Sequence, residues 1–132
     1  MTEYFITKMG DRVDIQKPDS YFQERQVLID RRGEVYIDKD SFWGFRVMVI
    51  SSSHEIINGE FGDIALKRVI VKKNAWICSG AILYNCVVGE NSIVSIGSVV
   101  KNMVIPDNTA VEGNPAKIVA ELREGRWHGV YT

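Results

Sequence analysis

An aliphatic residue recurs at every sixth position through the second half of the chain. The series consists of Val71, Ile77, Leu83, Val88, Val94 and Val100. Only the step between Leu83 and Val88 is shortened, to five residues. A helix favours spacings of three and four, and a hairpin sheet favours strict alternation, so this period fits neither. A short period repeated in this way predicts a solenoid.

Small and turn-forming residues occupy fixed places in each step. Four residues after an aliphatic come the small side chains that we expect at crowded inner corners: Ala75, Ala81, Ser92, Ser98 and, in the short step, Cys86. Three residues after come the residue types that accept a left-handed backbone with least strain: Asn74, Gly80, Asn91 and Gly97. Each step therefore predicts a short strand followed by a corner. Three steps make one triangular coil, and the coils stack at the strand spacing of about 4.8 Å.

The same register begins earlier, at Val35, and divides the chain into segments. Its inward residues there are Ile37, Trp43 and Val49, followed at the small positions by Ser41, Val47 and Ser53. Within one domain of 132 residues we expect an N-terminal cap region at 1–34, first coils at 35–54, an inserted loop at 55–68, later coils at 69–113, a short helix at 114–124 and a tail at 125–132.

The end of the chain carries the signals of a short helix. Asn114 can act as its cap, Pro115 as its first residue, and Gly125 as its stop. The tail that follows contains Trp127, His128 and Tyr131, which is more apolar surface than a free tail needs. We therefore expect the tail to pack on a neighbouring subunit.

The overall composition is that of an ordinary soluble protein, with 45% hydrophobic and 25% charged residues. A net charge of −1 gives no electrostatic reason to expect nucleic acid or an anionic membrane surface as the partner. The N-terminus has no apolar run that could form a signal peptide or a membrane span, so we expect a cytoplasmic location. Cys78 and Cys86 lack the spacing of a zinc site and are expected to be small interior residues.

Three stretches carry a resemblance to a known family. NAWICSGAIL, VVGENSIVSIGSVV and EGNPAKIV resemble the second half of the hexapeptide-repeat acyltransferases, which include galactoside, serine and xenobiotic acetyltransferases. The closing GNPAKIV is the most specific piece, and the resemblance covers roughly residues 35–119. It implies an all-β, left-handed parallel β-helix. The left hand comes from the resemblance alone, because parallel crossovers are otherwise right-handed in nearly all cases.

His54 directly precedes the inserted loop and lies upstream of NAWICSG. In the family that the resemblance implies, the histidine at this place is the general base. Near pH 7 an imidazole is largely neutral and can take a proton from a hydroxyl or amine as that atom attacks a thioester, so no acyl-enzyme is needed. The group that orients the imidazole stays open. Glu55 points away in an extended chain, so a backbone carbonyl or a residue of a neighbour is equally suitable.

The resemblance also implies an acyl donor and an oligomer. The family binds acetyl-CoA in a groove between the coils of adjacent subunits, so we expect a homotrimer with three shared sites. By motif, Trp76 and Ser79 occupy places that line the pantetheine path. Ile96 lies where a small residue usually contacts the pantetheine, and it is bulkier than the family pattern.

Three further residues are candidate cofactor contacts by the same motif. Lys101 and Asn102 occupy the place usually held by a Thr-Lys pair, and Lys117 is the basic residue after GNPA. Both lysines are candidates to bind phosphate.

The sequence thus predicts an acetyltransferase that uses acetyl-CoA and acts on a hydroxyl or amine of a sugar or sugar-nucleotide, as such chains often do in polysaccharide pathways. The alternative is a non-catalytic β-solenoid scaffold or partner-binding module, which departures from the repeat at Lys72, Cys78 and Ser95 favour. A drug-modifying acetyltransferase is a further alternative within the first class. The zinc carbonic anhydrase on the same fold needs three histidine ligands, and only His54 and His128 exist, so no metal is expected.

Overall fold

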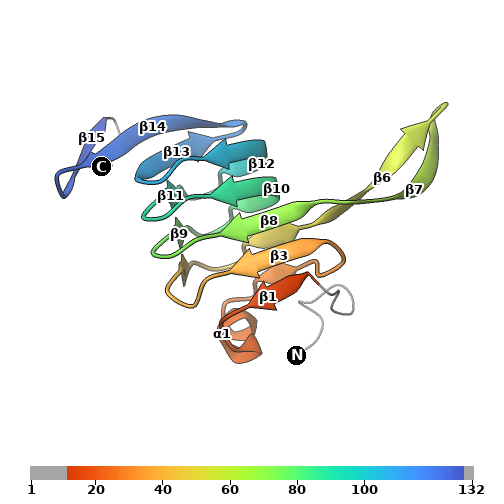
Figure 1. Ribbon diagram of the computed structural model, residues 1–132, viewed down its shortest axis with the longest axis horizontal. Helices are drawn as coiled ribbons and strands as arrows, with labels where there is room; N and C mark the ends of the chain where they lie inside the picture. Colours follow the sequence, from red (N-terminus) through yellow and green to blue (C-terminus); the bar gives the residue numbers. More distant parts are fainter. Residues whose placement is uncertain (1–11, 130–132) are drawn as a thin grey trace.

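The computed structural model describes residues 12–129, and most of its strands belong to one three-sided parallel β-helix (Figure 1). Side 1 stacks β1 (Val13–Ile15), β3 (Glu34–Ile37), β8 (Arg68–Val71) and the second halves of β10 (Ile82–Val88) and β12 (Val99–Ile105). Side 2 stacks β2 (Leu28–Ile29), β5 (Met48–Ile50) and the first halves of β10 and β12. Side 3 stacks β4 (Phe42–Trp43), β9 (Trp76–Ile77), β11 (Ile93–Val94) and β13 (Thr109–Gly113).

The predicted inward residues form the core of this prism. Trp43 is 5% exposed, and the other eight have no exposed surface: Ile37, Val49, Val71, Ile77, Leu83, Val88, Val94 and Val100. Each buried aliphatic side chain stabilises the fold by about 1.5–3 kcal/mol. The predicted small positions are also buried, except Ser53, which is half-buried. The prediction for Ser53 was wrong because the chain has already left the coil at Ser52.

Left-handed residues turn the corners, as predicted. Asn74, Gly80, Asn91 and Gly97 have φ angles of 60°, 74°, 59° and 68°. The shortened step has the same explanation, because Asn85 (φ 48°) carries β10 round a corner without interrupting the strand. Asparagines in successive coils also pair through their side chains, 17 residues apart, as in the 2.9 Å bond from the Asn85 amide to Asn102 Oδ1.

The N-terminal region contributes a coil of its own. Residues 1–11 lie outside the described part, but β1 and β2 already pair in parallel with β3 and β5. Between them α1 (Asp19–Glu24) replaces a side-3 strand, and its Phe22 packs edge-on against Trp43 with ring centroids 5.4 Å apart. The first coils therefore begin near Val13 rather than at residue 35, and within residues 12–34 the part that acts as a cap is α1. No helix of the described region is long and apolar enough to span a bilayer.

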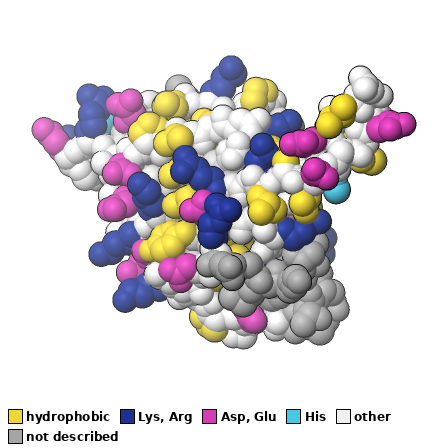
Figure 2. Space-filling view, turned by 45° about the vertical axis from the view of Figure 1, so that its right-hand side comes forward, with side chains coloured by type: hydrophobic (Ala, Val, Ile, Leu, Met, Phe, Trp, Pro, Cys, Tyr) yellow, Lys and Arg dark blue, Asp and Glu magenta, His cyan; other side chains and the backbone are white. Residues whose placement is uncertain are grey.

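The insertion predicted at 55–68 projects from the coil, and it is a β-hairpin rather than a loop (Figures 1 and 2). We call it the arm. It consists of β6 (Ser52–Ile57) and β7 (Glu60–Leu66), which pair in antiparallel fashion across an Asn58-Gly59 turn with φ angles of 52° and 77°. Two central residues with positive φ match the right-handed twist of a hairpin.

The short helix predicted at 114–124 is wrong. This segment contains β14 (Ala116–Arg123), which pairs antiparallel with β13 and continues into β15 (Arg126–Gly129). Without β14, the backbone N–H and C=O groups at the edge of β13 would be unpaired. A strand can form hydrogen bonds with these groups, whereas a helix cannot. Trp127 packs on its own chain, in a cluster with Cys78, Ile93 and Ala110, while Tyr131 lies outside the described residues.

Two valines of β12 test the inward register. Val100 is fully buried and Val104 is 61% exposed, four residues further along the same strand. Val100→Ala should lower the free energy of unfolding by about 2 kcal/mol, because it removes buried methyl groups and leaves a cavity. Val104→Ala, the matched control, should change it by less than about 0.5 kcal/mol. Urea unfolding measures both, and equal losses would contradict the register.

Candidate functional site

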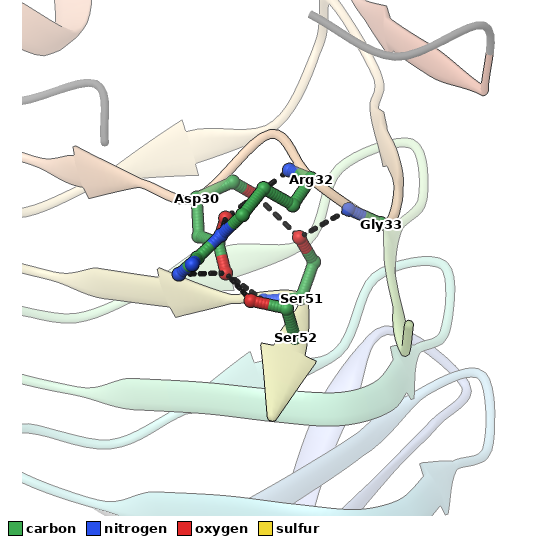
Figure 3. Close-up of polar contacts among 5 residues, drawn as sticks. All are labelled: Asp30, Arg32, Gly33, Ser51 and Ser52. Atoms are coloured by element: carbon green, nitrogen blue, oxygen red, sulfur yellow. Dashed lines mark hydrogen bonds and ion pairs between the residues drawn. The ribbon is translucent and has the colours of Figure 1, made fainter. Parts of the chain in front are cut away.

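The arm leaves the coil at the corner between sides 2 and 1, where Asp30 holds its first residues (Figure 3). The Asp30 carboxylate is fully buried and accepts hydrogen bonds from the Ser51 backbone N–H at 3.2 Å and from the Ser52 hydroxyl. Arg32 adds its backbone N–H at 3.1 Å and its guanidinium Nε at 2.9 Å. One carboxylate thus organises the point at which the chain changes from coil to arm.

The surroundings of Asp30 keep it ionised. Burial acts to raise the pKa of this carboxyl, but the hydrogen bonds from Arg32 and Ser52 outweigh burial and hold the pKa below its usual value. The carboxylate is therefore charged at neutral pH, and its charge strengthens each bond that it accepts.

Gly33, which directly precedes β3, has no side chain and therefore lets both ends of the arm pack against it. A Cβ at Gly33 would overlap the backbone carbonyl oxygens of Ser51 and Lys67, the residues that flank the arm. Instead, the Gly33 N–H donates to the Ser51 hydroxyl at 3.0 Å, and the Lys67 N–H donates to the Ser51 carbonyl at 2.8 Å. The two ends of the arm are therefore tied to each other and to one corner.

His54 lies on β6, exposed, two residues beyond Ser52. Its Nδ1 is 3.2 Å from the Gly62 carbonyl oxygen on β7, and its ring lies 5.7 Å from the Phe61 ring, centroid to centroid. A carbonyl oxygen can only accept, so this bond places the proton on Nδ1 and leaves the Nε2 lone pair free. The orienting group that the sequence left open is thus a backbone carbonyl of the same arm.

The rest of the arm presents apolar side chains to solvent. Five of them are between 44% and 82% exposed: Ile56, Ile57, Phe61, Ile64 and Leu66. Contiguous exposed apolar surface of this kind marks a contact site for another surface.

Trp76 forms part of a groove on side 3, across the prism from the arm. The groove has a volume of about 510 Å³ and is lined by Phe42, Asn74, Trp76, Asn91, Ile93, Leu122 and Trp127. Phe42 and Trp76 are register neighbours on β4 and β9, and both remain about half exposed. The groove lies beside β14 and β15 of the C-terminal hairpin, which contribute Leu122 and Trp127.

Ser79 and Ile96 share the corner between sides 3 and 2, one coil apart. The Gly97 N–H donates to the Ser79 carbonyl at 3.0 Å, and the Ser79 hydroxyl accepts from the Phe45 N–H at 2.9 Å. A Cβ at Gly97 would meet no atom within 4 Å, so this corner is open to an approaching molecule. Ile96 is 77% exposed beside it, which makes the corner more apolar than the family pattern implies.

The predicted phosphate contacts lie at separate places. Lys101 is exposed on β12, at the far end of side 2 from Ile96, and Asn102 follows it at the corner above the arm. Lys117 is exposed on β14, opposite Glu112 of β13. The structure therefore brings Ser79 and Ile96 together, and it does not gather all six candidates around His54 within one chain.

The sequence analysis missed the residues that hold the arm. Asp30, Ser51 and Ser52 were not singled out, although three consecutive serines directly before His54 were a sign of a polar anchor. Phe42, which lines the groove with Trp76, was not predicted, and Trp127 was expected to pack on a neighbouring subunit rather than to line the groove.

The two cysteines are interior residues, as predicted. Cys78 is 6% exposed, Cys86 is 2% exposed, and both are free thiols. Burial raises the pKa of Cys86 to about 12, so it is protonated at neutral pH. In the described residues 12–129, no three side chains among His, Cys, Asp and Glu are grouped as they would be to bind a metal ion.

Solved structures of hexapeptide-repeat acetyltransferases share this fold. One, from Vibrio cholerae and complexed with acetyl-CoA, has a TM-score of 0.65 and 21% identity, covering 74% of this chain and 55% of that one. A maltose O-acetyltransferase from Clostridium difficile has a TM-score of 0.64 and 26% identity, covering 69% and 50%. A galactoside acetyltransferase in complex with coenzyme A has a TM-score of 0.66 and 21% identity, covering 74% and 50%.

These likenesses confirm the fold expected from the motifs, a left-handed parallel β-helix of the kind found in hexapeptide-repeat acetyltransferases. The chain spans only about half the length of the solved chains that it matches. No protein-family model matches the sequence, and no curated protein matches it significantly.

Asp30 makes the stability of the fold dependent on pH. Asp30→Asn should lower the free energy of unfolding at pH 7 by about 1–3 kcal/mol, because the amide turns a donor toward groups that are themselves donors. The pKa of the folded carboxylate is depressed, so its contribution is present above the unfolded pKa of about 3.9 and is lost as pH falls through the folded pKa. The difference between the two proteins should therefore shrink below about pH 4.

Urea unfolding of both proteins between pH 3 and pH 7 measures this difference. A difference that stays constant across that range would contradict the assignment of the depressed pKa to Asp30.

Proposed function

We propose that this chain, which has the fold of the hexapeptide-repeat acetyltransferases, transfers an acetyl group from acetyl-CoA to a hydroxyl or amine of a sugar or sugar-nucleotide. The observation that carries the proposal is the geometry of His54. Its Nδ1 contacts the Gly62 carbonyl, and in the neutral tautomer that this contact favours, Nε2 carries the lone pair that a general base requires, on an exposed arm. Two of the similar structures are named as a maltose O-acetyltransferase and a galactoside acetyltransferase, which supports a sugar as the class of acceptor.

In the proposed reaction His54 deprotonates the acceptor, and the acceptor attacks the thioester of acetyl-CoA directly. Nε2 takes the proton of the acceptor hydroxyl or amine as that atom bonds to the thioester carbonyl carbon. The carbon–sulfur bond then breaks, and the imidazolium returns the proton to the CoA thiolate. No covalent bond to the protein forms, so one side chain supplies the acid–base chemistry in both directions.

The residues at the corner between sides 3 and 2 suit the CoA arm. Ser79, Ile96 and Gly97 form an open edge along which an extended pantetheine can lie, with Trp76 on the adjoining face. Lys101, which lies beside Asn102, and Lys117 are exposed cations that suit the phosphates at the nucleotide end of CoA. Acetyl-CoA is a cytosolic metabolite, so the proposal includes a cytoplasmic location.

The proposal further requires a neighbouring subunit. The arm and the groove that Trp76 lines lie on opposite sides of the prism. A single chain therefore cannot bring His54 to its own groove. The exposed apolar residues of the arm would be covered by the face of a second copy, which is a head-to-tail contact. Contacts of that kind close into a ring, and we propose a homotrimer with His54 of each subunit at the groove of the next.

A non-catalytic scaffold is the second candidate. The observation that favours it is Ile96, whose bulk at the open corner departs from the family pattern. Calorimetry separates the two, because a scaffold would not bind CoA and the proposed enzyme would.

His54→Ala should lower the rate of acetyl transfer by about 10²- to 10⁴-fold, because the base is lost while the groove for CoA remains. Release of free thiol from acetyl-CoA, measured across a panel of sugars, sugar-nucleotides and amine or alcohol drugs, gives the rate. His128→Ala is the matched control, since His128 is also exposed and should leave the rate unchanged. An unchanged rate in His54→Ala would exclude the assignment of His54 as base.

Mixed oligomers test whether sites are shared. His54→Ala subunits lack the base, and Ile96→Trp subunits have an indole that blocks the corner proposed for the pantetheine, so each protein alone should be inactive. When equal amounts are unfolded together and refolded, about a quarter of the sites should combine an intact His54 with an open corner. Recovery of about a quarter of the wild-type rate is expected, and no recovery would show that each site lies within one chain.

A further inference from the structure

We infer that Asp30 is a positioning residue for His54: its buried carboxylate fixes the direction in which the arm leaves the coil. This inference rests on the proposed role of His54 as base and deepens it. Asp30 lies on the coil, in the loop after β2, and does not itself reach the reacting atoms. It acts through the root of the arm, which we define as Ser51, Ser52 and Lys67.

The carboxylate binds two consecutive residues of the root. Oδ2 accepts the Ser51 backbone N–H at 3.2 Å and the Ser52 hydroxyl (Figure 3). Ser52 is the first residue of β6 and lies two residues before His54. The Asp30 backbone carbonyl also accepts the Ser51 hydroxyl at 2.5 Å. The position and the rotation of the first arm residues are therefore both set by Asp30.

The returning strand is tied to the same place. The Lys67 N–H donates to the Ser51 carbonyl at 2.8 Å, and the Lys67 carbonyl accepts the Glu34 N–H at 2.9 Å. Beyond the root, within the described residues, arm residues 54–64 make hydrogen bonds only within the arm. Since the polar contacts that join arm and coil are concentrated at the root, a change there alters the position of His54.

The negative charge of Asp30 is what the root requires. Five donor contacts converge on its two oxygens, three from Arg32 and one each from Ser51 and Ser52. An asparagine has the same shape, but it offers one oxygen and turns an N–H₂ group toward the remaining donors. Asp30→Asn therefore loosens the root with almost no change in packing volume.

The experiment compares Asp30→Asn with Val100→Ala in the full chain. Val100 lies in the core of β12, away from the root, and its truncation lowers global stability without touching the arm. Hydrogen exchange of the amides in residues 52–66 reports on the arm directly. Thiol release from acetyl-CoA gives kcat, and its dependence on acetyl-CoA concentration gives KM.

In the Asp30→Asn protein the amide hydrogens of the arm should exchange at least about tenfold faster than in the wild type. Its kcat should be about 10- to 100-fold lower, and its KM for acetyl-CoA should stay within about twofold of the wild-type value. Val100→Ala should leave arm exchange and kcat close to wild type. Unchanged arm exchange in Asp30→Asn would overturn the inference, as would faster exchange with an unchanged kcat. If instead His54→Ala retains full activity, the proposed function fails, and the exchange data still decide whether Asp30 holds the arm.

Discussion

The coils that follow the arm close through residues that hold a left-handed backbone at each corner. The sides between corners are only a few residues long, so a corner that opened would separate the strands on both sides of it. Asparagine and glycine reach that conformation with least strain, and in successive coils the asparagines also bond to one another. The aliphatic core and the parallel stacking follow from these turns.

Much of the fold could be predicted because its determinants are local and periodic. Val71, Ile77 and Leu83 were recognised as inward residues by their spacing alone, and all three are fully buried. The corners at Asn74 and Gly80 were recognised from residue type. Where periodicity is interrupted, prediction failed: α1 takes the place of a side-3 strand, so the coil at residues 13–34 was taken for a cap.

The remaining errors come from pairings between distant segments and from a turn that was overlooked. The signals near Asn114 and Gly125 are compatible with a helix, but the open edge of β13 favours a strand there. Asn58-Gly59 is a strong hairpin signal that was not used. His54 could be proposed as the base from its place before the insertion. Asp30, by contrast, bonds to Ser51 from 21 positions away in the sequence, and no local pattern connects the two.

The arm is joined to the coil in a way that leaves the periodicity intact. After the arm, successive coils repeat every 17 residues. Ile37 and Val71, which are register neighbours, are separated by twice that number because the arm lies between them. Its two ends meet through the bond from the Lys67 N–H to the Ser51 carbonyl. A hairpin inserted at one closed point can be lengthened, shortened or replaced by recombination while every strand keeps its partner. The surface that the arm presents can therefore change during evolution while the scaffold stays the same.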